Sequence, residues 1–222
     1  MTYDKKKKPW LSKKDAIRLG HSGWHSRGYL PHFTDKETTQ FVTFRLFDSM
    51  PQEVLEIWAK ELAHLSKIEK EIEKQKRIEL YLDRGYGSCY LQETGIASKV
   101  QEALLHFDHD RYALHAWVIM PNHVHTLFSP RNGWEWGNIL HSWRSYTANE
   151  CNKILGRSGT FWMRDPHDRY IRDEQHYSNA MSYIENNPVK AGLCTTPQDW
   201  QWSSASWDHQ DWERPHPAGE PL

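Results

Sequence analysis

A predicted β-hairpin with two histidines beside its turn constrains this chain more than any other stretch. The segments Tyr112–Ile119 and His123–Phe128 are rich in β-branched, aromatic and aliphatic residues, as strands prefer. Between them Met120–His123, with the sequence MPNH, predicts a tight turn, because proline presets φ at the second turn position and asparagine tolerates the third. Side chains two residues apart on a strand share a face, so His123 and His125 are expected to project together.

Two imidazoles side by side suit a divalent cation. The alternative is that both are ordinary surface or cross-strand residues, since the chain has 14 histidines and short motifs produce false matches. A metal site needs at least a third ligand, which the hairpin does not supply.

The length of 222 residues favours one domain with extensions. Its formal net charge of −1 means that any nucleic-acid surface must be a local patch. The three cysteines form no CxxC pair, which argues against a disulfide framework or a cysteine zinc site. No apolar stretch has the length of a signal sequence or membrane span, so we expect a cytoplasmic protein that does not bind membranes.

The order of predicted elements indicates the fold class. Hydrophobic periodicity predicts a first strand at 40–47, a long helical region at 52–84 that Gly85 and Gly87 end, and a second helix at 98–107. The hairpin follows at 112–128, and then a helix at 132–155 with Asn132 as N-cap. A short strand at 160–164, a loop at 165–172 and a last helix at 174–187 complete the order. Such an order favours an α+β, ferredoxin-like antiparallel sheet with packed helices.

The last predicted helix carries polar residues that could face the histidines. Asp173 is an acceptable N-cap, and Pro188 is expected to end the helix at Asn187. His176, Asn179, Tyr183 and Asn187 follow one another at three- or four-residue steps and so share one line on the helix surface. If the helix crosses the sheet near the hairpin, Asn187 could supply an oxygen to a bound metal and Tyr183 would lie beside it. Alternatively, Tyr183 packs at the helix edge and Asn187 is only a helix-end residue.

Several of these residues belong to longer motifs, which are MPNHVH at Met120–His125, GTFW at Gly159–Trp162, DRYIRD at Asp168–Asp173, YIENNPVKAG at Tyr183–Gly192 and RGYLPH at Arg27–His32. In these motifs the chain resembles the REP-associated tyrosine transposases, within the HUH class of single-stranded-DNA nucleases. The resemblance covers about residues 27 to 207.

The resemblance implies an HUH-type, ferredoxin-like fold and an active site. By that resemblance His123, His125 and Asn187 hold Mg²⁺ or Mn²⁺ beneath the scissile phosphate. Tyr183 attacks phosphorus to give a 5′-phosphotyrosine and a free 3′-hydroxyl without any nucleotide cofactor, and reversal of the step rejoins strands. Tyr170 is the competing nucleophile, and ranks second because no amide lies four residues after it.

The resemblance also implies single-stranded or hairpin DNA, of the REP palindrome type, as the partner. The residues expected to contact it are Lys5, Lys6, Lys7, Lys8, Arg164, Arg169, Arg172 and Trp162, with Trp134 and Trp136 as further stacking candidates. The chain is expected to divide into a basic arm (1–30), a catalytic domain (31–197) with a helical insertion at about 52–84, and a tryptophan-rich tail (198–222).

Two other functions are open at this stage. One is a protein of the same fold that recognises structured DNA or RNA without cutting it. The other is a metal-dependent hydrolase of small molecules, which predicts a closed pocket instead of a basic groove.

Overall fold

The scaffold is a four-stranded antiparallel sheet. The computed structural model describes residues 24–26, 31–33 and 38–207. The sheet has the order β4-β5-β3-β6 and is formed by β3 (Gln40–Arg45), β4 (Tyr112–Ile119), β5 (His123–Pro130) and β6 (His167–Tyr170). A separate antiparallel pair joins β1 (Trp24–Ser26) to β2 (Pro31–Phe33).

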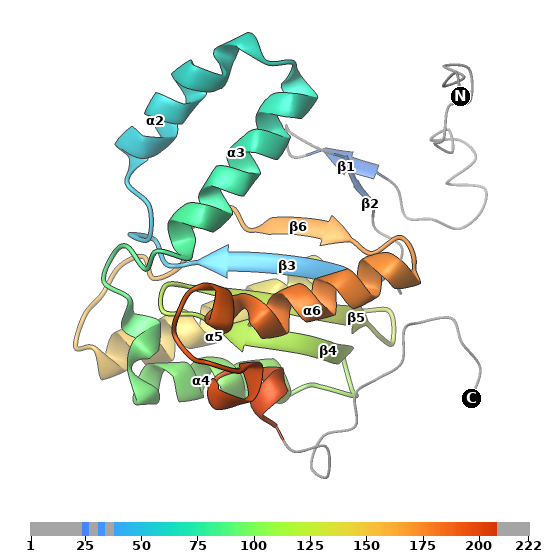
Figure 1. The fold of residues 1–222 in the computed structure, drawn as a ribbon. Coiled ribbons are helices and arrows are strands. Elements are labelled where there is room, and N and C mark those ends of the chain that lie inside the picture. The colour runs from blue at the N-terminus through green and yellow to red at the C-terminus, as the bar shows by residue number, and fades with distance from the viewer. Residues whose placement is uncertain (1–23, 27–30, 34–37, 208–222) are drawn as a thin grey trace.

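Helices cover both faces of this sheet (Figure 1). Helices α4 (Thr94–Leu105) and α5 (Trp136–Ile154) pack together on one face, and α6 (Glu174–Lys190) crosses the other. The path β3-α4-β4-β5-α5-β6 with that strand order is ferredoxin-like, so the predicted α+β class is confirmed.

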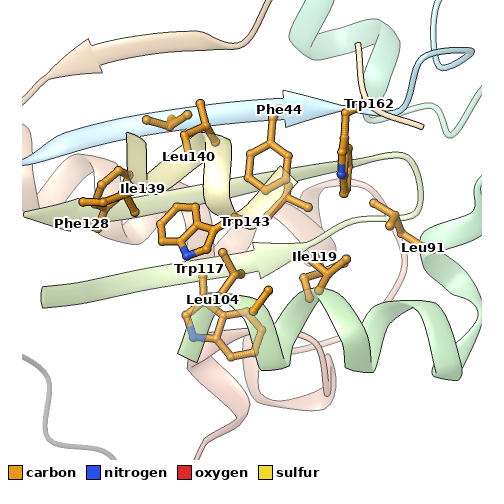
Figure 2. Packing of buried hydrophobic residues seen from close by; sticks show 14 of the residues in the cluster. Phe44, Leu91, Leu104, Trp117, Ile119, Phe128, Ile139, Leu140, Trp143 and Trp162 are labelled. Carbon is orange, nitrogen blue, oxygen red and sulfur yellow. The ribbon is translucent and has the colours of Figure 1, made fainter. Parts of the chain in front are cut away.

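The larger core lies between the sheet and the α4/α5 layer. Figure 2 shows Phe44, Trp117 and Phe128 of the sheet packed with Leu104 of α4 and Trp143 of α5. A smaller core, under α6, contains Phe41, Leu127, Tyr177 and Ile184. The alternation along β3 explains the division, because Phe41, Thr43 and Arg45 point toward α6 while Val42 and Phe44 point toward the larger core.

The region between β3 and α4 holds the two helices α2 (Gln52–Glu61) and α3 (Lys67–Leu82), which project beyond the β6 edge of the sheet (Figure 1). The short 3-10 turn η1 (Leu62–His64) separates them, so the single helical pattern of the sequence is in fact a helical hairpin. The capping box of Ser66 and Glu69 starts α3, since each side chain hydrogen-bonds the other residue's backbone N–H.

Four predicted boundaries were wrong. Helix α4, expected at 98–107, is Thr94–Leu105. Asn132 does not cap α5: it has φ +53° before Gly133 at +77°, and Glu135 is the N-cap. The last strand is His167–Tyr170, whereas the predicted strand 160–164 forms only one bridge, between Leu46 and Trp162. Helix α6 continues through Pro188 to Lys190. Proline removes only one donor, and the buried side chains of Asn187 and Pro188 hold the last turn against the sheet.

The first residues of the predicted tail pack on the sheet. Two short turns, η3 (Pro197–Asp199) and η4 (Ser204–Ser206), lead the chain along β4, and the Trp200 indole donates to the Ile119 carbonyl at 3.0 Å. Trp202 and Trp207 pack against the larger core.

A third turn, η2 (Tyr90–Gln92), lies elsewhere in the chain and precedes α4. In the part of the chain that the structure describes, no helix is long and apolar enough to span a membrane.

Candidate active site

The two hairpin histidines lie side by side in the middle of the sheet, on the face that α6 covers. On the neighbouring strand β3, Arg45 pairs with His123 and Thr43 pairs with His125. Both imidazoles are 1% exposed, and their Nε2 atoms are 3.0 Å apart. The expectation that His123 and His125 project together is therefore met, because strand alternation aims both rings at the same point beneath α6.

Helix α6 brings Asn187 to that point. The side chain is 1% exposed, and its Nδ2 atom lies 3.4 Å from His125 Nε2. Its Oδ1 atom is buried and makes no hydrogen bond of good geometry to a described residue. A buried amide oxygen without a partner is costly, and a cation is one group that would satisfy it.

Tyr183 lies one helical turn before Asn187. Its ring centroid is 5.4 Å from that of His125 and 5.9 Å from that of Phe41, with both pairs edge-on. The hydroxyl is buried and, like Asn187 Oδ1, has no well-oriented hydrogen bond within the described residues. Burial raises the pKa of Tyr183 well above its ordinary value, and the nearby carboxylates Glu79 and Asp83 add to the shift. The group is therefore a protonated phenol at neutral pH.

The imidazoles are neutral at the same pH. Burial lowers the pKa of His123 to about 3, and the positive charges of Lys190 and Arg45 contribute. Burial also lowers the pKa of His125 well below its ordinary value, with His123 and Arg169 adding to the effect. Neutral imidazole is the form that binds metal.

The side chains of His123, His125 and Asn187 fit a divalent cation by their chemistry. Two neutral imidazole nitrogens and an unpartnered amide oxygen are acceptable ligands for Mn²⁺ and Mg²⁺, which keep water in their remaining positions. Among residues 38–207 no group of three or more His, Cys, Asp or Glu side chains is placed to hold a metal. Within these residues, the further polar side chain in contact with His125 Nε2 is the neutral amide of Asn187.

Positive charge and a cleft surround the histidines. The Arg169 guanidinium carbon lies 4.5 Å from the centroid of the Phe41 ring, and Lys190 Nζ lies 5.6 Å from that of Tyr183. A cleft of about 600 Å³ opens between the α2/α3 hairpin and the sheet, with Thr43 and Arg45 in its lining. The helical hairpin is joined to α6 beside Tyr183, because Lys190 Nζ contacts Asp83 Oδ2 at 2.8 Å.

The competing nucleophile points away from the histidines. On β6 it is His167 that pairs with Thr43 and Arg169 that pairs with Phe41, so these two side chains share the α6 face. Tyr170, which pairs with Gln40, lies on the opposite face of the strand and three residues, roughly 10 Å, farther along it.

The predicted DNA contacts are scattered. Lys5, Lys6, Lys7 and Lys8 lie outside the described residues. Arg169 is at the site, Arg172 is exposed before α6, and Arg164 lines a separate groove of about 510 Å³ beside α5. Trp162 is 4% exposed and Trp136 is 6% exposed, and both line the groove that contains Arg164. The Trp162 ring contacts Phe44 and Phe161 edge-on, and its indole donates to Thr147 Oγ1. Little of either ring is open to solvent, and stacking of a base on them stays a prediction.

Sequence reasoning missed several residues around the histidines, namely Thr43, Arg45, Glu79, Asn122, His167 and Lys190. The alternation of Phe41, Thr43 and Arg45 was visible in the sequence. Nothing in it gave the register that places this strand beside the hairpin.

Comparisons with known proteins agree with the motifs. No protein-family profile matches the chain. It is 28% identical over 131 residues to a protein of Haemophilus influenzae named as a REP-associated tyrosine transposase, covering 54% of this chain and 72% of that protein. It is 24% identical over 107 residues to the REP-associated tyrosine transposase of Escherichia coli, covering 47% of this chain and 62% of that one. The resemblance inferred from the motifs is thus confirmed by curated homologues.

A solved structure is similar as well. A REP-associated tyrosine transposase bound to a REP hairpin aligns with a TM-score of 0.50 and 19% sequence identity, over 89% of this chain and 97% of that one. At this identity the likeness shows a shared fold.

Proposed function

We propose that this chain, a homologue of the REP-associated tyrosine transposases, is a metal-dependent enzyme that nicks and rejoins single-stranded DNA at hairpin-forming sites. Tyr183 is the nucleophile, and His123, His125 and Asn187 hold Mg²⁺ or Mn²⁺. The catalytic domain spans residues 31–197, with the helical insertion at 52–84, the arm at 1–30 and the tail at 198–222.

One observation carries this proposal. The phenol of Tyr183 and the amide of Asn187, from the last long helix, converge on two neutral imidazoles from the central strand. Nothing in the packing of a sheet requires three unlike polar groups to be buried at one point, where the Tyr183 hydroxyl and Asn187 Oδ1 have no well-oriented hydrogen bond to a described residue. A site that positions a nucleophile beside a cation does require it.

The reaction needs charge neutralisation and in-line positioning more than a strong base. A bound divalent cation would polarise the nonbridging oxygens of the scissile phosphate. The Tyr183 oxygen then forms a bond to phosphorus, the bond from phosphorus to the 3′ oxygen breaks, and the strand is left with a free 3′-hydroxyl and a 5′-phosphotyrosine. Because the pKa of the phenol is raised, loss of its proton depends on positive charge nearby, which Arg169 and Lys190 supply.

The proposed substrate is DNA with a hairpin beside an unpaired segment. The homologues are named for REP elements, and the structure with the same fold holds a REP hairpin. Arg169 is placed to contact phosphate near the cut, whereas Arg164, Arg172 and the lysines at 5–8 are proposed to contact the backbone elsewhere.

A second candidate function is favoured by the burial of the nucleophile. The Tyr183 hydroxyl is covered, so DNA cannot reach it without a movement of α6 or of the α2/α3 hairpin. If that movement does not occur, the protein binds DNA or RNA hairpins without cutting them.

A covalent adduct distinguishes the two. The full chain is incubated with Mn²⁺ and a hairpin oligonucleotide labelled on the 3′ side of the expected cut, and the products are resolved on a denaturing gel. We expect a protein-linked label that is lost in Tyr183→Phe and retained in the matched control Tyr170→Phe. Tight hairpin binding without any adduct, across metals and pH, would replace the enzyme with the binding protein.

A further inference from the structure

Each candidate metal ligand on the hairpin has a buried polar partner behind it. His123 Nδ1 lies 2.7 Å from Asn122 Oδ1, and His125 Nδ1 lies 2.7 Å from Thr43 Oγ1. Asn122 is fully buried and Thr43 is 5% exposed. These contacts decide which ring nitrogen carries the proton, and therefore which one offers a lone pair.

The orientation of the Asn122 amide is determined by the backbone. Its Nδ2 atom donates to the Tyr86 carbonyl at 2.9 Å, and a carbonyl can only accept. Oδ1 is therefore the atom that faces His123, so Nδ1 of that ring must donate. A neutral imidazole has one N–H, which leaves His123 Nε2 as a lone pair.

The Tyr86 carbonyl is itself held by a tight loop after α3. Gly85 and Gly87 both have positive φ, and a Cβ at Gly87 would lie 2.7 Å from the Asp48 carbonyl oxygen. Asp48 Oδ2 also accepts from the Ser88 backbone N–H at 2.9 Å. The loop is thus pressed against the segment after β3, and the amide of Asn122 is fixed through it.

His125 has a partner of a different kind. Its Nε2 is 3.0 Å from the His123 Nε2 lone pair, which requires a positive group opposite it. That group is either the proton on His125 Nε2 or a cation between the rings. The Thr43 hydroxyl both donates and accepts, so it can serve His125 in either case. A carbonyl in place of Thr43 would force both lone pairs to face each other whenever no cation was bound.

We propose that Asn122 and Thr43 are positioning residues for the metal site: Asn122 holds the His123 proton permanently at Nδ1, and Thr43 lets the His125 proton exchange between Nε2 and Nδ1. With a cation at the Nε2 atoms, the His125 ring would carry its single proton at Nδ1 instead of Nε2 and would stay neutral. The Thr43 hydroxyl turns from donor to acceptor with this change. This inference rests on the metal site of the proposed function.

Tautomers are observable directly. Nitrogen-15 two-bond correlation spectra of the full chain distinguish Nδ1–H from Nε2–H rings, and His123→Gln and His125→Gln variants assign the two signals. Without metal we expect His123 as the Nδ1–H form and His125 as the Nε2–H form. With saturating Mg²⁺ we expect both as Nδ1–H. An Nε2–H form of His123 in metal-free protein would overturn the proposal.

Binding of Mn²⁺ alone, followed by electron paramagnetic resonance, gives a second readout. Thr43→Val keeps the side-chain shape but removes the hydroxyl, and Asn122→Leu removes the amide. Each is expected to weaken Mn²⁺ binding by about 10- to 100-fold. Thr43→Ser, which restores the hydroxyl, should bind within about 3-fold of the parent chain.

A matched control separates this from the general loss of a buried hydroxyl. Thr126 is fully buried on β5 and donates to the Val42 carbonyl on the far side of the strand from the imidazoles. Thr126→Val should leave Mn²⁺ affinity unchanged. Circular dichroism excludes unfolded variants, and a Thr43→Val protein that is folded and binds Mn²⁺ like the parent refutes the role of Thr43.

Adduct formation by the parent chain tests the proposed function, whereas the tautomers and the Mn²⁺ affinities of the variants test the roles of Asn122 and Thr43. If the parent chain forms the DNA adduct but the tautomers or affinities are not as expected, only the positioning roles are wrong. If the parent chain binds no Mn²⁺ and forms no adduct, the proposed function is wrong, and the metal-free tautomer of His123 still decides whether Asn122 fixes that ring.

Discussion

Replacing Asn187 with leucine should stabilise the metal-free protein while removing its response to divalent cations. The amide is 1% exposed and its Oδ1 atom has no well-oriented partner in the described part of the chain. Leucine has nearly the same shape, and the site borders the apolar side chains that pack under α6. If Asn187 serves as a metal ligand, its replacement should raise the stability of the metal-free protein. If Asn187 is instead a structural residue, the same replacement should lower that stability.

The expected size follows from three contributions. Removing a buried, unsatisfied acceptor gains about 1–3 kcal/mol. Losing the Nδ2 contact to His125 costs little, because it is long at 3.4 Å and the Nε2–H form of His125 expected without metal cannot accept from it. The higher helix propensity of leucine adds up to about 0.5 kcal/mol. The net gain of about 1–2 kcal/mol should raise the Tm by roughly 3–6 °C for a chain of this length.

The assay is thermal unfolding in EDTA and again with excess Mn²⁺. At about 100 times its Kd, Mn²⁺ should stabilise the parent chain by about 2.7 kcal/mol and the variant hardly at all, so the order of the two Tm values reverses. Asn186→Leu is the control, because Asn186 is exposed on the same helix and bonds only within it, to Ser182. It tests helix propensity without the buried site.

The opposite outcome is clear. An Asn187→Leu protein that unfolds at lower temperature in EDTA, and that Mn²⁺ stabilises as much as the parent, would mean that Asn187 supports packing and not a cation.

Three further results are expected. Trp162→Phe should lower stability by about 1–2 kcal/mol, because it removes the buried hydrogen bond to Thr147. Hairpin affinity in a gel-shift titration should stay unchanged, since little of the ring is exposed; a large loss of affinity would support a DNA contact at this residue. Gly87→Ala should lower the free energy of unfolding, measured with denaturant, by about 1–3 kcal/mol, because φ is +92° and the added Cβ would lie 2.7 Å from the Asp48 carbonyl oxygen. Gly85→Ala should lower it less, since its Cβ would meet Cys89 Sγ at 4.0 Å. Equal losses in the two variants would contradict the close approach at Gly87. Arg169→Gln should reduce the slope of log affinity against log salt concentration for hairpin DNA by about 1. Arg77→Gln should leave that slope unchanged, because the Arg77 side chain on α3 is paired with Glu61 of α2 and Glu73 of α3.

The sheet and its hairpin were predictable because their signals are local. The alternation at the start of 40–47, the β-branched and aromatic content of 112–119 and 123–128, and the turn at Pro121 and Asn122 are properties of short stretches, and the structure keeps them. The last helix was predictable for the same reason, although Pro188 ended it too early in the prediction. A proline rule describes an isolated helix, and here burial of the final turn outweighs the single lost hydrogen bond.

The meeting of the four polar side chains could be predicted only on the condition that the last helix crosses the sheet near the hairpin. Periodicity gave the line shared by Tyr183 and Asn187 and the face shared by His123 and His125, and the structure places them together. Their roles remain proposals.

The surroundings of the site depend on contacts between distant segments. Thr43 reaches His125 through the β3/β5 register, and Lys190 reaches Asp83 across 107 positions of the chain. The burial of Trp162 also depends on packing, since the local sequence Phe161–Arg164 does not show whether its ring faces solvent or the core.

Helix α6 has a consequence for how such a site could be switched. Tyr183 and Asn187 stand one turn apart on a single rigid rod, while both imidazoles belong to the sheet. A slide or roll of that rod would therefore move the proposed nucleophile and the proposed third ligand together. Under the proposed function, a site that holds the ion with all three ligands but lacks the phenol is a state that this architecture disfavours.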